Sequence, residues 1–249
     1  MRTELAFLLA VLTVAILSVP LFAIGAGRRG RDPREIDNRG SFVLGPFVRN
    51  WFYWFQGPVD RAALALGIGP LFFNLAGVFF GVLAGVLFAM GHLTLAGWSI
   101  LLGGWADIVD GRIARALGIA DERGAFLDST LDRFAEFGAF VGLAVLFKES
   151  ELALVLVTTA LGGALLVSYA RARGESVGVV CKIGIMQRAE RLLLLGFGGI
   201  LDPAVSAWAG RGPGTLLIPV LAIIAVGTVW TSAYRTWWIA ARLRKPRSD

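Results

Sequence analysis

The sequence predicts an all-α integral membrane protein, and two observations lead to this class. Hydrophobic residues make up 56% of the 249-residue chain, charged residues make up 17%, and the mean hydropathy is +0.70. A soluble domain usually has about 25% charged residues, so the composition excludes the ordinary soluble classes. The apolar residues also fall into separate runs of about 20 residues, the length that a helix needs to cross a bilayer.

Seven apolar runs are long enough to be membrane spans. We expect one N-terminal transmembrane helix in residues 1–27, a linker in residues 28–66, and six further spans in a domain at residues 67–249. The runs cover residues 4–26, 69–90, 95–117, 125–147, 152–172, 189–209 and 214–240. The first run is long for a signal peptide and is followed by the basic pair Arg28 and Arg29. This flank is typical of a stop-transfer segment, so we expect an uncleaved helix.

The second half of the linker mixes aromatic and charged side chains. Residues 43–66 interleave rings such as Phe47, Trp51 and Trp54 with charges such as Arg49. Tryptophan and other amphipathic rings prefer the headgroup layer of a membrane. The segment therefore predicts an interfacial amphipathic helix, which is compatible with a helix packed on the bundle.

The basic residues predict the orientation in the membrane. Of the 24 Lys and Arg residues, 21 fall within residues 28–61, 112–133, 171–191 and 235–247, and the other three lie in the alternate segments. Basic loops face the cytoplasm, so we expect a multi-pass protein of the cell inner (cytoplasmic) membrane. The net charge of +6 then reflects topology and attraction to anionic membrane lipids. No base-reading motif is present, and we expect no nucleic-acid partner.

Four aspartates lie close together in this apolar chain, at Asp107, Asp110, Asp128 and Asp132. With helices on both sides of a turn near residues 118–123, each pair shares one helix face. An aspartate at a bilayer centre costs roughly 2.5–3.5 kcal/mol on insertion scales, so the cluster predicts a neutralising cation. Carboxylate oxygens suit Mg²⁺ or Mn²⁺, whereas one histidine and one cysteine leave little material for a zinc site.

The aspartates belong to a longer pattern of eight positions. The other members are Gly111, Ala114, Arg115 and Gly124, with eight residues between Arg115 and Gly124. This pattern resembles the signature of the CDP-alcohol phosphatidyltransferase family at every position, and the family's core corresponds to about residues 65–240 here. The resemblance implies a six-helix transmembrane CDP-alcohol phosphotransferase bundle, to which this chain adds an N-terminal transmembrane helix and the interfacial helix. It also implies a metal-dependent enzyme with CDP-diacylglycerol as donor.

The resemblance assigns a role to each aspartate. It implies that Asp107, Asp110 and Asp128 are the main metal ligands, and that Asp132 is a further ligand and the catalytic base. Two metal ions a few ångströms apart can stabilise attacking and leaving oxygens together, and four carboxylates can hold two such ions. The attacking alcohol must also lose a proton to a base within hydrogen-bond reach.

The small residues of the pattern have two readings. The resemblance implies that Gly111, Ala114 and Gly124 line a pocket for the cytidine nucleotide, with Arg115 near the diphosphate. Small residues at such spacing also let helices pack closely, and this alternative stays open.

A second polar cluster concerns the acceptor alcohol. Arginine binds phosphate oxygens bidentately, so arginines at the cytoplasmic mouth predict a phosphorylated acceptor. Their segments resemble those of bacterial phosphatidylinositol phosphate synthases, which implies inositol phosphate as acceptor and CMP as leaving product. The implied acceptor-phosphate ligands are Arg171, Arg188, Arg191 and Arg235. Arg171 replaces a lysine of that pattern.

Two other functions remain open at this stage. A phosphatidylglycerophosphate synthase would use glycerol 3-phosphate and would also need an arginine-lined site. A divalent-metal transporter predicts acidic residues spread through the membrane depth, but Asp202 is the one other aspartate in the later predicted helices. Clustering on one side favours chemistry over transport. The sequence leaves open whether the ion is Mg²⁺ or Mn²⁺, and it is compatible with a homodimer.

Overall fold

The computed structural model describes residues 2–26, 45–119 and 121–243, and in these ranges every regular element is an α-helix. The prediction of an all-α fold is confirmed. The first part of the predicted linker, residues 27–44, lies outside the described ranges. The helices are α1 (Arg2–Ala26), α2 (Gly45–Ala65), α3 (Pro70–Ala89), α4 (Leu93–Ala116), α5 (Glu122–Leu146), α6 (Glu151–Ser176), α7 (Arg188–Ala209) and α8 (Leu217–Leu243).

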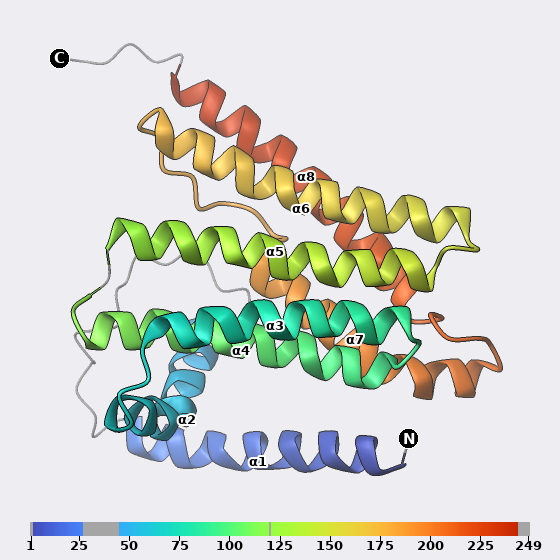
Figure 1. Ribbon diagram of the computed structural model, residues 1–249, viewed down its shortest axis with the longest axis horizontal. Coiled ribbons are helices and arrows are strands. Elements are labelled where there is room, and N and C mark those ends of the chain that lie inside the picture. Colours follow the sequence, from blue (N-terminus) through green and yellow to red (C-terminus); the bar gives the residue numbers. More distant parts are fainter. Residues whose placement is uncertain (1, 27–44, 120, 244–249) are drawn as a thin grey trace.

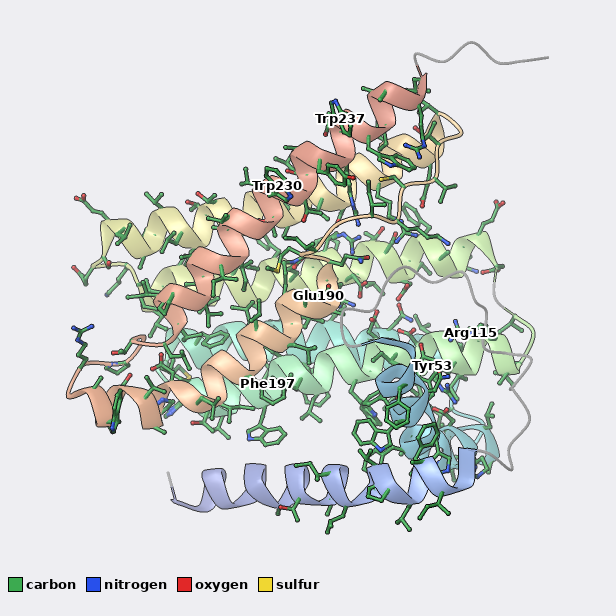
Figure 2. All side chains as sticks on the ribbon, turned by 180° about the vertical axis from the view of Figure 1, so that it is seen from behind. Tyr53, Arg115, Glu190, Phe197, Trp230 and Trp237 are labelled. Atoms are coloured by element: carbon green, nitrogen blue, oxygen red, sulfur yellow. The ribbon has the colours of Figure 1, made fainter. Side chains whose placement is uncertain are left out.

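Each predicted apolar run has become a helix, and the predicted interfacial segment forms α2. Four of the helices, α3, α6, α7 and α8, are long and apolar enough to cross a membrane. Helices α4 and α5 are not among these four, because they carry the signature aspartates together with other charged residues, such as Arg112 on α4 and Glu136 on α5. The surface also fits a lipid setting, since rings such as Trp230 and Trp237 on α8 are exposed (Figure 2).

The bundle is built from closely packed helix pairs. Helix α3 packs against both α4 and α5, α4 packs against α7, and α6 packs against α8. In Figure 1, α3 and α4 lie in the middle of the molecule, and the α6–α8 pair lies beyond α5. The main apolar core contains Phe88, Ile100, Phe140 and Leu195. It occupies the halves of α4 and α5 that lie away from the four aspartates, so the polar residues gather at the other end.

Helices α3 and α5 approach each other through glycines. A Cβ atom added to Gly142 on α5 would overlap the backbone of Gly85 on α3, and one added to Gly85 would overlap the backbone of Gly138. Without side chains at these positions the two backbones can touch, as in other membrane helix pairs that meet through small residues. This contact fixes α5 against α3 and thereby sets where the start of α5 meets the end of α4.

We expect Gly142→Ala to lower the free energy of unfolding by about 3 kcal/mol or more, because the helices must separate to admit the methyl group. Thermal unfolding of the purified protein in detergent would measure the effect. The matched control is Gly162→Ala on α6, where an added Cβ meets nothing within 4 Å. Equal thermal stability of the two variants would contradict the close approach.

The far end of the bundle is held by a buried carboxylate. Asp202 on α7 is fully buried, and its side chain accepts hydrogen bonds from the Ser206 hydroxyl and from the backbone N–H groups of Gly214, Leu216 and Leu217, at 2.8–2.9 Å. A carboxylate with this many donors is fully satisfied despite its burial. Asp202 therefore fixes the loop between α7 and α8 and lies apart from the signature aspartates.

Candidate active site

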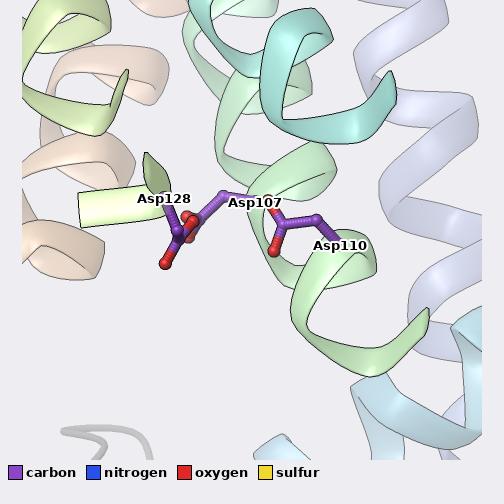
Figure 3. Close-up of side chains that lie close together, drawn as sticks. All are labelled: Asp107, Asp110 and Asp128. Atoms are coloured by element: carbon purple, nitrogen blue, oxygen red, sulfur yellow. The ribbon is translucent and has the colours of Figure 1, made fainter. Parts of the chain in front are cut away.

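Three of the signature aspartates converge at the junction of α4 and α5. One carboxylate oxygen from each of Asp107, Asp110 and Asp128 lies within 4.8 Å of the others (Figure 3). Asp110 is buried, with 4% of its surface exposed, and the other two are half-buried. Three carboxylates held together in an apolar bundle repel one another unless positive charge compensates them. An all-oxygen donor set of this kind fits a hard divalent cation such as Mg²⁺ or Mn²⁺.

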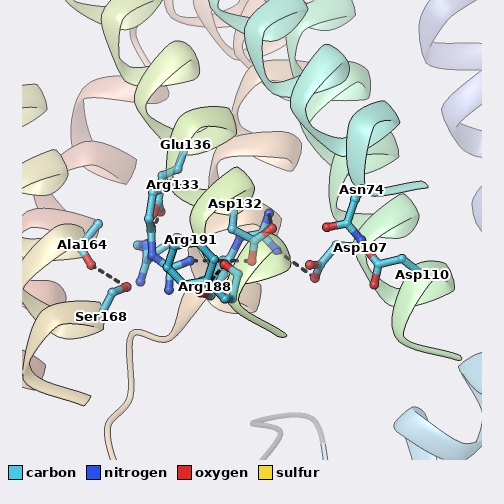
Figure 4. A network of polar contacts seen from close by, with 12 residues as sticks. Asn74, Asp107, Asp110, Asp132, Arg133, Glu136, Ala164, Ser168, Arg188 and Arg191 are labelled. Carbon is cyan, nitrogen blue, oxygen red and sulfur yellow. Dashed lines mark hydrogen bonds and ion pairs between the residues drawn. The ribbon is translucent and has the colours of Figure 1, made fainter. Parts of the chain in front are cut away.

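The fourth aspartate joins the group through an arginine of α7. Arg188 places Nη1 2.8 Å from Asp107 Oδ2 and Nη2 2.7 Å from Asp132 Oδ1 (Figure 4). Asp132 itself lies outside the trio of converging oxygens and has Arg133 Nη1 at 3.6 Å. The guanidinium of Arg188 thus bridges α4 and α5 at the edge of the carboxylate cluster.

An amide on α3 orients the most buried of the carboxylates. Asn74 Nδ2 donates to Asp110 Oδ2 at 2.8 Å, while Asn74 Oδ1 is buried and has no hydrogen-bond partner among the described residues. Sequence reasoning missed Asn74, although a polar amide inside the apolar run of residues 69–90 was a usable signal. A hydrogen bond to a ligand carboxylate fixes the direction in which that carboxylate presents its other oxygen.

Helix α2 braces the other face of α4. Asp60 on α2 accepts hydrogen bonds from Gln56 Nε2 at 3.0 Å and from Arg112 Nε at 2.5 Å. The Arg112 guanidinium also lies over the ring of Tyr53, 4.7 Å from its centroid, and Figure 2 shows Tyr53 on this helix. Arg112 is only two residues beyond Asp110, so α2 is fixed to the turn of α4 that carries the carboxylates.

The residues predicted to bind the nucleotide lie near the end of α4 and at the start of α5. The guanidinium of Arg115 lies over Gly111. A Cβ added to Gly111 would be 3.2 Å from Arg115 Nη1. Ala114 is half-buried on the same helix. Gly124 is exposed in the first turn of α5, and its N–H donates to the Asp121 side chain at 2.7 Å, which caps the helix. A larger residue at Gly111 would displace Arg115.

The four arginines predicted to bind the acceptor phosphate have different surroundings. Arg171 is about half exposed and pairs with Glu175 at 2.9 Å, while Arg188 contacts the aspartates. Arg191 and Arg235 are 1% and 3% exposed. Arg191 and Arg235 are therefore buried within the bundle, whereas the sequence led us to expect both at the cytoplasmic mouth of the site.

Both buried arginines bind groups of the protein itself. Arg191 pairs with both carboxylate oxygens of Glu136, at 2.6 and 3.0 Å, and donates from Nη1 to the Met186 carbonyl at 3.1 Å. Arg235 donates to the carbonyls of Ile183 at 2.7 Å and Val167 at 2.9 Å. The carbonyls of Met186 and Ile183 belong to the loop between α6 and α7, so these arginines hold that loop in place.

Comparison with known proteins adds a finding to this geometry. The family model for CDP-alcohol phosphatidyltransferases matches residues 69–239. The chain belongs to this family. The match begins just before α3, ends within α8 and includes all eight signature positions, whereas α1 and α2 precede it. The family prediction made from residues 107–132 is therefore confirmed.

Within the CDP-alcohol phosphatidyltransferase family, this chain is similar to synthases of inositol phosphate lipids. The phosphatidylinositol phosphate synthase of Streptomyces avermitilis is 34% identical over 208 residues, covering 79% of this chain and 82% of the relative. The archaetidylinositol phosphate synthase of Methanothermobacter thermautotrophicus is 31% identical over 150 residues, covering 60% of this chain and 75% of the relative. Both relatives are named as synthases of an inositol phosphate lipid.

Solved structures of the family share the fold. The Mycobacterium tuberculosis phosphatidylinositol phosphate synthase with CDP-DAG bound superposes with a TM-score of 0.63 at 26% identity, covering 73% of this chain and 92% of that one. The same enzyme in complex with manganese and citrate gives a TM-score of 0.64 at 26% identity, covering 74% and 88%. The prediction of a helical membrane-enzyme fold agrees with both.

Proposed function

We propose that this CDP-alcohol phosphatidyltransferase moves the phosphatidyl group of CDP-diacylglycerol to inositol phosphate and releases CMP. The observation that carries the proposal is the junction of α4 and α5, where three carboxylates converge beside an arginine that bridges to Asp132. Support for the donor and acceptor comes from the relatives, which include phosphatidylinositol phosphate synthases and a structure with CDP-DAG bound.

The metal belongs to the proposal as well. The oxygens of Asp107, Asp110 and Asp128 fit one or two Mg²⁺ or Mn²⁺ ions, and the manganese complex of the mycobacterial enzyme supports this reading. A bound divalent ion would supply charge neutralisation on the diphosphate oxygens. Asn74 would hold Asp110 in the orientation that this requires, through its hydrogen bond of 2.8 Å.

In the transfer step, a hydroxyl oxygen of the acceptor attacks the phosphorus of the phosphatidyl group. A new phosphorus–oxygen bond forms while the bond from that phosphorus to the CMP oxygen breaks. Asp132 takes the hydroxyl proton as general base, and Arg188 orients its carboxylate from 2.7 Å. Arg115, which covers Gly111, would contact the diphosphate of the nucleotide, with Ala114 and Gly124 beside it.

We assign the acceptor phosphate to Arg171 and Arg188, because their side chains are partly exposed, by 48% and 19%. Arg191 and Arg235 support the loop that leads into α7, as their bonds to carbonyls indicate. We propose further that the site faces the cytoplasm from the inner membrane and that the protein assembles as a homodimer.

The acceptor is tested by offering purified protein CDP-diacylglycerol and Mg²⁺ with one alcohol at a time. The alcohols are inositol 1-phosphate, glycerol 3-phosphate, free inositol and serine, and the readout is released CMP. We expect turnover with inositol 1-phosphate to exceed that with each of the others. Preferential turnover with glycerol 3-phosphate would instead make the protein a phosphatidylglycerophosphate synthase.

A further inference from the structure

A buried ion pair lies directly behind the bridge made by Arg188. On α5, Asp132 and Glu136 are four residues apart, and on α7, Arg188 and Arg191 are three residues apart, so each pair shares one helix face. The result is a ladder with two rungs, Asp132–Arg188 at the mouth and Glu136–Arg191 one turn deeper (Figure 4). The side chains of the deeper rung are 3% and 1% exposed.

The ladder joins two helices that are placed by other neighbours. Helix α5 packs mainly against α3 and α6, and α7 packs mainly against α4 and α8. Long side chains therefore span the space between α5 and α7 near the site. A bidentate arginine–carboxylate pair has one preferred relative geometry, so the deeper rung fixes how far the first turn of α7 stands from α5.

The deeper rung also holds the segment that precedes Arg188. Arg191 also donates from Nη1 to the Met186 carbonyl, and the Met186 N–H donates to Thr231 Oγ1 at 3.3 Å. The end of the α6–α7 loop is thus tied to α5 through Arg191 and to α8 through Thr231. Arg188 follows this tied residue by two positions, so its direction depends on the tie.

We infer that Glu136 is a positioning residue: it fixes Arg191, and through Arg191 it holds the start of α7 so that Arg188 faces Asp107, Asp132 and the acceptor phosphate. The role of Arg188 toward the acceptor rests on the proposed function, whereas the effect of Glu136 on the loop does not. A purely structural ion pair would stabilise the fold without setting the affinity for the acceptor.

The test uses the double variant Glu136→Met with Arg191→Met. Removing one partner alone would leave a buried charge unpaired and could unfold the protein, but replacing both partners with apolar residues of similar size is often neutral for stability. The two readouts are the hydrogen exchange rate of the Met186 N–H and the KM values for acceptor and donor. The control is Asp202→Asn, which weakens the fold at the far end of the bundle.

We expect the folded double variant to exchange the Met186 N–H about tenfold faster or more, because the tie to α5 is lost. Its KM for inositol 1-phosphate should rise about tenfold while the KM for CDP-diacylglycerol stays within about twofold. The control should leave the Met186 exchange rate and both KM values unchanged, even though its melting temperature falls.

If the Met186 N–H of the double variant exchanged at the wild-type rate, the inference would be wrong, whatever the KM values. Faster exchange with an unchanged acceptor KM would overturn the link between Glu136 and Arg188. If the wild-type protein turns over none of the offered alcohols, the proposed function fails, and the exchange rate alone then decides whether Glu136 positions the start of α7.

Discussion

Replacing Asp132 with asparagine is expected to lower turnover by about 100- to 10,000-fold, the usual contribution of a general base. Asparagine keeps the size of the side chain and can still accept a hydrogen bond from Arg188, which lies 2.7 Å from the carboxylate. It cannot take the proton of the attacking hydroxyl. Single-turnover measurement of CMP release, with donor and acceptor both saturating, would isolate this step.

The control for this variant is Glu149→Gln, which removes one negative charge from a side chain that is 89% exposed. Its turnover should remain within about twofold of wild type, since exposed charges distant from a site contribute little. If Asp132→Asn retained near-normal turnover, another group would have to accept the proton, and the role of Asp132 would be wrong.

Replacing Asp110 with asparagine should reduce turnover by on the order of 100-fold or more, because several kcal/mol of charge stabilisation depend on a properly held metal. Asp110 is the most buried of the three converging carboxylates. The variant keeps an oxygen that can accept from Asn74 but loses the negative charge. Mn²⁺ binding followed by electron paramagnetic resonance should show weaker binding in parallel with the lost activity.

Asn74→Ala provides a graded comparison for the same carboxylate. It leaves the charge of Asp110 in place and removes only the hydrogen bond of 2.8 Å. Losing such a partner of a ligand typically costs about 10- to 100-fold in metal affinity or activity, so this variant should fall between wild type and Asp110→Asn. Normal Mn²⁺ affinity in Asp110→Asn would contradict the placement of the metal.

Local spacing was enough to predict the helices and the core of the site. The run from Asp107 to Asp132 lies on two consecutive helices, and the three- and four-residue intervals put each pair of aspartates on one face. The turn between them places the start of α5 near the end of α4, whereas the packing of both helices against α3 sets how closely their aspartates approach. The helical folding of the apolar runs follows likewise from their composition.

The contacts made by α7 and α8 were harder to predict. Glu136 and Arg191 are 55 residues apart, and an arginine near a membrane surface equally predicts a flanking charge, a phosphate ligand or a buried partner. The matching spacings were a usable signal, since Glu136 follows Asp132 by one turn and Arg191 follows Arg188 by one turn. Arg235 gave no such sign, because its partners are backbone carbonyls.

The central claim is that the chain makes a phosphatidylinositol phosphate by a metal-dependent transfer. Incubating purified protein with CDP-diacylglycerol and inositol 1-phosphate, and analysing the lipids by mass spectrometry, tests it most directly. We expect the phosphorylated inositol lipid and CMP to appear in equal amounts with Mg²⁺ or Mn²⁺, and both to disappear when a chelator is added. Product formation that persists in the chelator, or intact donor with metal present, would contradict the account.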